Sequence, residues 1–412
     1  MRIIFVDELE SSRANGIGTF RRMLLPGLAK EVELIVLGLQ AGVEKPSVVD
    51  DDGFKEYFFP NFTDDNGGWR ANGDKIFDML IDVLPDSHGN IFLINHSPCA
   101  QFIDELKKRF PKSKTVFVIH DQGWCGHLLG SRKFLKQIMV DGTVPRQVPE
   151  ETATYVKEYC DKELEIYRRV DAIVALSETC RSTLIGIYGV PADKIHVIPN
   201  GYNSTEGRRP TKSQARKRLG ISDDEEIIVY AGRTVRHKGI EPLLMAIARL
   251  RKNHPRLRCV MCGSLSGFAK YGKLIEPVAA SLILTGFIPS KNLRYWYAAA
   301  DVGIMPSYSE PFGYSGIEMA DAGLPVVVSD GNCLTDIYND GVNGFVASIG
   351  PDVTRTSHFV QSLTAKVEEA LDCTPKKRKK IISESRERIR NMYSAERMSA
   401  TYLSLFQHLI VK

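Results

Sequence analysis

Two glutamates separated by seven residues, Glu310 and Glu318, are the strongest chemical signal in the sequence. The segment between them is rich in glycine and aromatic residues, and an apolar helical pattern begins at Ile317. Glu310 is therefore expected on a loop and Glu318 within the first turns of a helix. The N-terminus of a helix presents free N–H groups that suit a phosphate, and carboxylates accept hydrogen bonds from a diol. This combination predicts a nucleotide-sugar site.

Two cations in the same half of the chain support this prediction. Arg233 follows the apolar run Ile227–Tyr230, and Lys238 comes five residues later, before a helical pattern. Arginine offers paired planar donors and lysine a compact charge, so together they could hold a diphosphate. Taken alone, the segment is equally well explained as a solvated basic loop, because Arg236 and His237 lie there too. The nearby glutamates favour the diphosphate interpretation.

A pair of carboxylates is also typical of glycosidases. That interpretation is disfavoured here, because Glu310 and Glu318 share one element with a phosphate-type helix start and have a cation pair nearby. The acidic clusters Asp50–Asp52 and Asp64–Asp65 are interpreted as solvated turns rather than as a metal-binding acidic pair. Among eight cysteines, Cys259 and Cys262 have metal-like spacing, but they lie in an apolar strand pattern and would point to opposite faces. We expect reduced core thiols rather than a zinc site.

Length and charge limit the class of protein. A chain of 412 residues exceeds what one hydrophobic core usually supports, so two domains are expected. The net charge of +4 is compatible with an anionic ligand or membrane surface and too small to indicate nucleic acid. No window reaches the ~18 apolar residues of a transmembrane helix, and Met1–Asp7 does not resemble a signal peptide. We expect a cytoplasmic protein, with peripheral contact at the inner face of the plasma membrane left open.

Apolar strand patterns alternate with helical patterns in both halves, which predicts parallel sheets flanked by helices. In the first half, strands are expected at 3–6, 33–37, 91–94, 115–119, 172–175 and 196–198, and helices at 19–30, 76–84, 99–109 and 152–169. In the second half, strands are expected at 227–230, 259–262, 282–285, 302–305 and 326–328, and helices at 239–253 and 292–299.

A polar stretch rich in glycine and proline, Pro199–Pro210, predicts a linker between the halves. The expected fold is α/β, with two Rossmann-like domains at 1–203 and 204–394 that face each other across a cleft. The C-terminal segment 395–412 has an amphipathic pattern and could complete the first domain.

Arg233, Lys238, the Glu310–Glu318 element and the downstream segment Asp340–Phe345 together resemble the retaining GT-B glycosyltransferases of family 4 (glycosyl transferases group 1). The likeness covers nearly the whole chain and is strongest from about 195 to 350. It implies that 1–203 binds the acceptor and 204–394 binds the nucleotide-sugar donor.

The resemblance also implies roles for individual residues. Glu318 would hold the ribose hydroxyls, Glu310 would hold a hydroxyl of the donor sugar, and the base would lie near Gly263 or Gly286–Ile288. Arg233 and Lys238 would neutralise the leaving nucleoside diphosphate. Backbone groups of four residues would contact the sugar and the diphosphate: Phe312, Gly313, Tyr314 and Ser315.

The first half fits the same family. Gly16 and Gly18, in Ala14–Thr19, follow the first strand and open a helix, where glycine lets backbone approach a phosphate. The full GxGxxG is absent, which disfavours a nicotinamide enzyme. His120 matches the family histidine near the reacting face of the sugar, although a histidine satisfied at a strand end is the alternative. His96 is either an acceptor contact or part of a turn.

Three positions depart from the family pattern. Asp330–Cys333 has one glycine where a Gly-Gly pair is common, Asp336 stands where glutamate is usual, and Pro311 replaces a frequent glycine. These differences leave the donor site intact and could tune which sugar or base is accepted.

The resemblance implies transfer of a hexose-type sugar with retention, without a metal cofactor, and with a UDP-sugar favoured over a GDP-sugar. The acceptor would be a glycan, lipid-linked or protein-linked molecule in cell-surface polysaccharide or glycoconjugate biosynthesis. The long segment Gly123–Glu151 could bind an anionic or lipid-linked glycan, or it could be a surface helix. The basic run Lys376–Lys380 could contact anionic lipid, or it could be the solvated face of a helix. A GT-B-like nucleotide-sugar epimerase and a catalytically silent glycan-binding paralogue are the alternatives.

Overall fold

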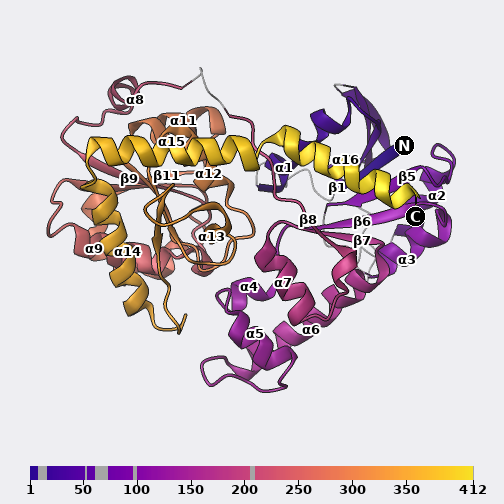
Figure 1. Ribbon diagram of the computed structural model, residues 1–412, viewed down its shortest axis with the longest axis horizontal. Helices are drawn as coiled ribbons and strands as arrows, with labels where there is room; N and C mark the ends of the chain where they lie inside the picture. Colours follow the sequence, from indigo (N-terminus) through magenta and orange to yellow (C-terminus); the bar gives the residue numbers. More distant parts are fainter. Residues whose placement is uncertain (8–15, 52, 61–72, 96–99, 205–208, 412) are drawn as a thin grey trace. The chain divides into compact units, whose positions relative to one another are not determined.

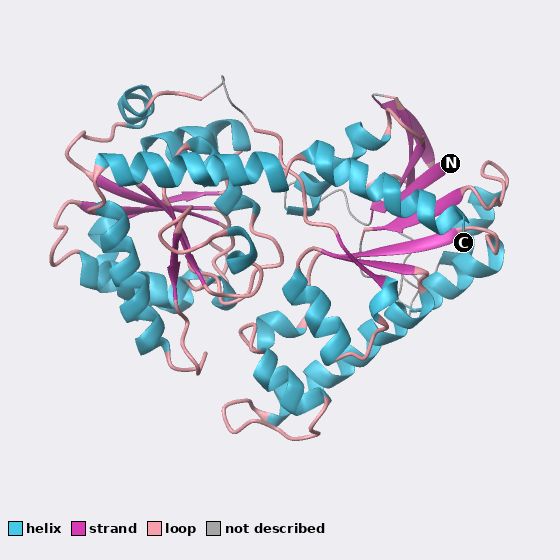
Figure 2. Cartoon of the chain, in the orientation of Figure 1, coloured by secondary structure: helices cyan, strands magenta, loops and turns pink. Residues whose placement is uncertain are grey.

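The computed structural model describes residues 1–7, 16–51, 53–60, 73–95, 100–204 and 209–411 (Figure 1). The chain divides into two compact units. The first comprises Met1–Trp124, Lys133–Asn203 and Tyr393–Lys412, and the second comprises Cys125–Arg132 and Ser204–Met392. In each unit, helices flank a sheet that is wholly or mainly parallel (Figure 2).

The sheet of the first unit has the strand order β3-β4-β2-β1-β5-β6-β7-β8 within the described residues. The β3–β4 pair is antiparallel, and the other neighbouring pairs are parallel. The strands are β1 (Arg2–Asp7), β2 (Glu33–Ala41), β3 (Ser47–Asp51), β4 (Phe54–Pro60), β5 (Asn90–Ile94), β6 (Lys114–Ile119), β7 (Ala172–Ala175) and β8 (Ile195–Val197).

The edge hairpin of β3 and β4 was not predicted. Asp50 and Asp51 lie in β3, so their interpretation as part of a solvated turn is wrong. Asp50 pairs with Lys55 of β4, and opposite charges across an antiparallel pair stabilise such a strand. An edge strand tolerates these polar residues because one side of it faces solvent. Asp52, Asp64 and Asp65 lie outside the described residues.

The helices of the first unit include the C-terminal one. They are α1 (Gly16–Leu28), α2 (Gly73–Ile81), α3 (Ala100–Arg109), α5 (Arg132–Met139), α6 (Glu150–Arg169), α7 (Glu178–Gly186) and α16 (Ala395–Val411). Helix α16 packs against α1 and buries Tyr402, whose ring centroid lies 6.1 Å from that of Phe20. A Cβ at Gly27 would lie 2.2 Å from the Ser399 hydroxyl oxygen, so glycine permits this close approach.

The sheet of the second unit is parallel, with the order β11-β10-β9-β12-β13-β14 among the described strands. The strands are β9 (Glu226–Ala231), β10 (Leu257–Cys262), β11 (Leu282–Gly286), β12 (Val302–Met305), β13 (Val326–Ser329) and β14 (Phe345–Ala347). The main helices are α8 (Lys212–Leu219), α9 (Ile240–Leu250), α11 (Ser290–Ala299), α12 (Tyr314–Ala322), α14 (Thr356–Leu371) and α15 (Pro375–Met392). Cys259 and Cys262 are buried free thiols in β10, as predicted.

A short segment from the first half of the sequence, Cys125–Arg132, groups with the second unit. It includes most of helix α4 (Trp124–His127), and its Leu129 joins the hydrophobic core of the second unit. The expected domain boundaries assigned this segment to the first domain. The segment Gly123–Glu151, expected to be either a glycan-binding segment or a surface helix, contains α4, α5 and the first residues of α6, joined by turns.

The basic run Lys376–Lys380 lies on α15 and makes specific contacts. Lys377 forms a 2.8 Å ion pair with Glu369, and Arg378 donates to the backbone carbonyl of Asp301 at 2.7 Å. Part of this run thus holds α15 on its own unit. Within the described part of the chain, every helix is too short or too polar to span a bilayer.

Candidate functional site

The predicted site residues of the second unit follow two neighbouring strands. Arg233 and Lys238 come after β9, and Glu310 comes after β12, which pairs with β9 in parallel. The carboxyl ends of neighbouring parallel strands meet at one edge of the sheet, where open α/β sheets bind their ligands. The topology thus brings the predicted cations and the first glutamate to the same edge.

Lys238 and Glu310 form an ion pair. The Lys238 ammonium lies 2.7 Å from Glu310 Oε2, and the two side chains are 13% and 14% exposed. The same oxygen accepts a 3.2 Å hydrogen bond from the Ser307 hydroxyl. Burial of a carboxylate is costly without such partners. The pair therefore fixes both charges at the strand ends.

Close contact between two loops builds this pair. The Tyr308 amide donates to the carbonyl of His237 at 2.8 Å, joining the loop after β12 to the turn after β9. Gly239 has φ of 73°, and a Cβ there would lie 1.8 Å from the carbonyl oxygen of Pro306. Glycine is required at this position for both its backbone conformation and its lack of a side chain.

The segment after β13 supports the Glu310 loop. Asn332 Nδ2 donates to the Ser309 hydroxyl at 2.7 Å, and the Cys333 thiol contacts the Glu310 carbonyl oxygen at 2.9 Å. Asn332 has a positive φ of 47°. Its side-chain amide makes a contact that glycine could not make. Asn332 therefore helps to anchor the Glu310 loop.

Helix α12 starts directly after the loop. Gly313 precedes its first residue with φ of 94°, and a Cβ there would lie 2.8 Å from the methyl carbon of Met305. Phe312 is buried, with its ring 5.0 Å from that of Tyr314, and the Ser315 hydroxyl lies 3.8 Å from the sulfur of Met305. These contacts orient the first turn of α12, where the N–H groups of Gly316 and Ile317 donate to the Gly313 carbonyl at 3.0 and 3.4 Å.

Glu318 lies in the second turn of α12 and has its own partner. Tyr297, a buried residue of α11, donates its hydroxyl to Glu318 Oε2 at 3.0 Å. Sequence reasoning missed Tyr297, as it missed Ser307, because neither residue belongs to a recognisable motif. Both hold a predicted site carboxylate in place.

The electrostatic field around Lys238 is positive. Burial, together with the charges of Lys238 and Arg233 and a smaller effect of His127, lowers the pKa of His237 to about 4. His237 is therefore neutral at pH 7. Arg233 is exposed and makes no ion pair within the described residues, and its carbonyl accepts from the Tyr230 hydroxyl at 2.7 Å. The positive charges of Lys238 and Arg233 contribute to the lowering of the His237 pKa, and they favour an anion near His237.

The segment Cys125–Arg132 lies against this site and was not predicted to do so. A Cβ at Gly126 would lie 3.5 Å from His237 Nδ1, and one at Gly130 would lie 2.7 Å from the carbonyl oxygen of Tyr308. Gly130 has φ of 67°, which suits glycine. This segment thus packs on the two loops that carry Lys238 and Glu310.

The remaining predicted residues belong to the first unit. Gly16 is the first residue of α1 and is exposed, whereas Gly18, the third residue of this helix, is buried. His120 follows β6, forms a hydrogen bond with Asn95 Oδ1, and packs edge-on against Phe20 of α1 at 4.7 Å. The first unit therefore brings His120 next to α1. Ala14, Asn15 and His96 lie outside the described residues.

Family comparisons agree with this architecture. Residues 14–206 match Glycosyltransferase Family 4, and residues 211–388 match Glycosyl transferases group 1. The chain belongs to glycosyltransferase family 4. It is 32% identical to a D-inositol 3-phosphate glycosyltransferase of Streptosporangium roseum, over 48% of this chain and 46% of that protein. It is 28% identical to an uncharacterized glycosyltransferase, MJ1607, of Methanocaldococcus jannaschii, over 55% of this chain and 61% of that protein. The chain thus spans about half the length of the curated relatives it matches.

Solved structures confirm the predicted GT-B fold. Sucrose-phosphate synthase from Thermosynechococcus elongatus superimposes with a TM-score of 0.75 over 100% of both chains, at 19% identity. Anabaena Alr3699/HepE, solved in complex with UDP and glucose, superimposes with a TM-score of 0.68 over 99% of this chain and 100% of that chain, at 16% identity. At these identities the likeness establishes the fold alone.

Proposed function

We propose that this protein is a retaining glycosyltransferase that moves a hexose-type sugar from a nucleotide-diphosphate sugar to a glycan, lipid-linked or protein-linked acceptor. The pathway would be cell-surface polysaccharide or glycoconjugate biosynthesis. The observation that carries the proposal is the buried Lys238–Glu310 pair at the carboxyl ends of β9 and β12, beside the start of α12. A cation, a carboxylate and the N-terminus of a helix meet there, and these groups suit a glycosyl phosphate.

The leaving group is the main target of catalysis in this proposal. Arg233 and Lys238 neutralise the nucleoside diphosphate as negative charge develops on its departing oxygen. The first turn of α12, with Phe312, Gly313, Tyr314 and Ser315, supplies backbone contacts to the sugar and the phosphates. Fixed charges and dipoles aimed at a developing anion are usually the largest catalytic term. The protein's own cations would thereby do what a metal ion does elsewhere.

The carboxylates bind hydroxyls in this mechanism. Glu310 accepts a hydrogen bond from a hydroxyl of the donor sugar, and Glu318 accepts from the ribose hydroxyls. Tyr297 keeps Glu318 oriented through its 3.0 Å hydrogen bond. Because Glu310 already neutralises Lys238, it is better suited to hold a hydroxyl than to act as a base.

The transfer step needs one proton movement. The acceptor hydroxyl attacks the anomeric carbon from the side of the leaving group, so the bond from that carbon to the acceptor oxygen forms while the bond to the phosphate oxygen breaks. The acceptor proton passes to the departing phosphate, which becomes the nucleoside diphosphate. We assign His120 to the reacting face of the sugar. Gly16 and Gly18 would let the backbone at the start of α1 come close to a phosphate.

A UDP-sugar is the favoured donor, supported by the UDP named in the HepE complex of the same fold. Gly263 or Gly286–Ile288 would lie near the base. The expected cytoplasmic location and peripheral contact with a membrane remain predictions.

A screen of UDP- and GDP-sugars tests the proposal. Each is incubated with the protein, and release of nucleoside diphosphate and the shift in Tm are measured. Slow donor hydrolysis without acceptor, together with stabilisation by one nucleoside diphosphate, supports transfer chemistry. Clean isomerisation of the sugar would instead establish an epimerase, and binding without any turnover would establish a silent paralogue.

A further inference from the structure

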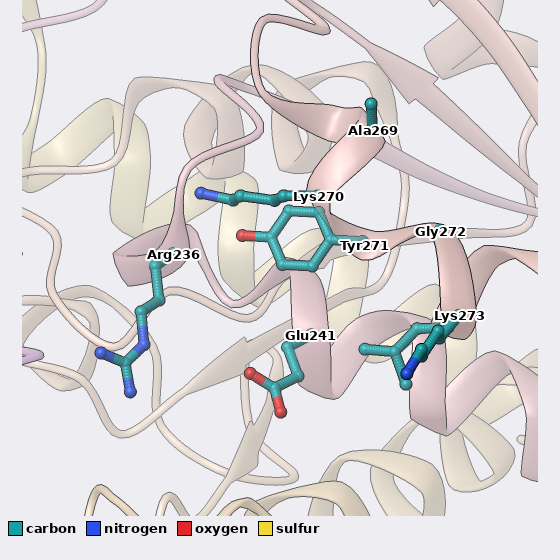
Figure 3. A pocket seen from close by; sticks show the side chains of 8 residues that line it. Arg236, Glu241, Ala269, Lys270, Tyr271, Gly272 and Lys273 are labelled. Carbon is teal, nitrogen blue, oxygen red and sulfur yellow. The ribbon is translucent and has the colours of Figure 1, made fainter.

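A separate cavity lies beside the turn that carries Lys238. Its volume is about 620 Å³, and its lining comes from the turn η4 (Arg236–Lys238), the start of α9, and the segment that begins with η5 (Phe268–Tyr271). The lining residues are Arg236, Glu241, Ala269, Lys270, Tyr271, Gly272, Lys273 and Leu274 (Figure 3). Arg233, Lys238 and the two glutamates of the donor site are not among them.

The side chains that line this cavity carry a net positive charge. Arg236, Lys270 and Lys273 contribute three positive charges against one negative charge from Glu241. None of these three cations makes an ion pair within the described chain. All three side chains are exposed, so solvent screens their mutual repulsion, but together they attract an anion to the space between them.

A buried hydroxyl also lines the cavity without a partner. Tyr271 is 8% exposed, and its hydroxyl has no hydrogen bond. The Lys270 ammonium lies 5.0 Å from the centre of the Tyr271 ring, which holds the two side chains together. In Figure 3 the Lys270 amine and the Tyr271 hydroxyl point in the same direction, toward the side where Arg236 lies. Leaving a buried hydroxyl unpaired is unfavourable, so a ligand group that bonds to it would be stabilising.

We propose that this cavity binds a phosphomonoester of a polyhydroxylated molecule, that is, a ligand of the sugar-phosphate class. A phosphomonoester carries −1.5 to −2 charges at neutral pH, which matches the net charge of the cavity. Glu241 and Tyr271 then contact hydroxyls, because a carboxylate accepts and a phenol both donates and accepts. The volume lies within the range of small-molecule sites. Arg236 shares its three-residue turn with Lys238, so such a ligand would hold the turn that places the leaving-group cation.

Calorimetry with glucose 6-phosphate as the probe tests this site in the full chain. The double variant Lys270→Gln/Lys273→Gln should bind the probe at least about tenfold more weakly, since each lost charge-assisted contact costs that much or more. The double variant Lys379→Gln/Lys380→Gln removes two exposed charges from α15 and should bind as the wild type does. Equal affinity in the two double variants would overturn the proposal.

The Lys238→Ala variant separates this cavity from the donor site. Lys238→Ala should retain wild-type affinity for glucose 6-phosphate. If its affinity falls as much as that of the Lys270→Gln/Lys273→Gln variant, the probe binds at the donor diphosphate site and the proposal is overturned. No donor is present in this assay, so its outcome is independent of whether the protein hydrolyses a nucleotide sugar.

The hydroxyl contacts have their own test. Tyr271→Phe should weaken glucose 6-phosphate about threefold or more and leave inorganic phosphate unchanged, because the lost hydroxyl bonds to the sugar. Equal affinities of wild type for inorganic phosphate and glucose 6-phosphate would contradict recognition of the polyhydroxylated part.

Discussion

The Lys238 ammonium and the Glu310 carboxylate lie 2.7 Å apart, on loops that follow two neighbouring strands, and both are largely buried. The two groups come from positions 72 residues apart. Their pairing means that the cation assigned to the leaving group and the acid assigned to the sugar are held together before any ligand binds. Preorganised charges of this kind cost little reorganisation during the reaction.

Glu310→Gln should separate nucleotide binding from turnover. Removing the negative charge beside Lys238 leaves that cation unpaired, so UDP should bind at least as tightly as to the wild type. The charge-assisted hydrogen bond to the donor sugar is lost, so donor hydrolysis should fall about 10- to 100-fold. Calorimetry and a diphosphate-release assay measure the two effects. Glu276→Gln, at an exposed position of the same unit, is the control and should change neither.

Tyr297→Phe should raise the donor KM about three- to tenfold, because Glu318 loses the hydroxyl that orients it. The matched control is Tyr295→Phe on the same helix, whose hydroxyl contacts Arg294. Steady-state kinetics with the preferred donor measure both variants. Identical donor KM values for Tyr297→Phe and Tyr295→Phe would show that Tyr297 does not orient Glu318 for donor binding.

Gly239→Ala should destabilise the protein by several kcal/mol, because its Cβ would overlap the Pro306 carbonyl oxygen and its φ is 73°. Gly220→Ala is a matched control with φ of 66° and open space around the added Cβ, so it should cost only about 1–2 kcal/mol. Denaturant unfolding measures the difference. Similar costs would show that the two loops do not press together at Gly239.

Stability should depend on Glu163 between pH 5 and 8. Burial raises the pKa of Glu163 to about 8, although the Tyr188 hydroxyl donates to it at 2.5 Å. In the unfolded chain its pKa is about 4.3, so over this range the unfolded state loses the proton that the folded state keeps. The contribution of Glu163 to the free energy of unfolding therefore decreases as pH rises, and this dependence ends above the folded pKa.

Glu163→Gln removes that dependence. Relative to the wild type, the variant should gain at least about 1 kcal/mol of stability between pH 5 and pH 8. Urea unfolding at several pH values measures it. Parallel pH profiles of wild type and variant would show that Glu163 ionises in the folded state as it does in the unfolded chain.

Much of the fold could be predicted because buried parallel strands are continuous apolar runs. Strands such as β1, β9 and β12 were located to within one or two residues, and the positions of Arg233, Lys238 and Glu310 after strands followed from that. The antiparallel β3–β4 hairpin was missed because its residues are mixed polar and apolar, and β14 was missed because three residues carry no periodicity.

The supporting contacts could not be predicted. Tyr297 reaches Glu318 from another helix, and Asn332 reaches Ser309 from another strand end, so these contacts depend on tertiary packing. The same holds for Leu129, which enters the core of the second unit from a segment that precedes most of that unit in the sequence. Motif spacing identified the charges, and packing between distant segments decided how they are held.

Release of nucleoside diphosphate by Lys238→Ala and Arg233→Ala, compared with wild type, tests the central claim most directly. The assay uses the UDP- or GDP-sugar that the wild type hydrolyses, and circular dichroism checks that each variant is folded. Lys252→Ala, at an exposed position on the same unit, is the charge-matched control. The account predicts that turnover falls about 100-fold or more in Lys238→Ala and Arg233→Ala and is unchanged in the control. Undiminished turnover in folded Lys238→Ala and Arg233→Ala would contradict the assignment of these cations to the leaving group.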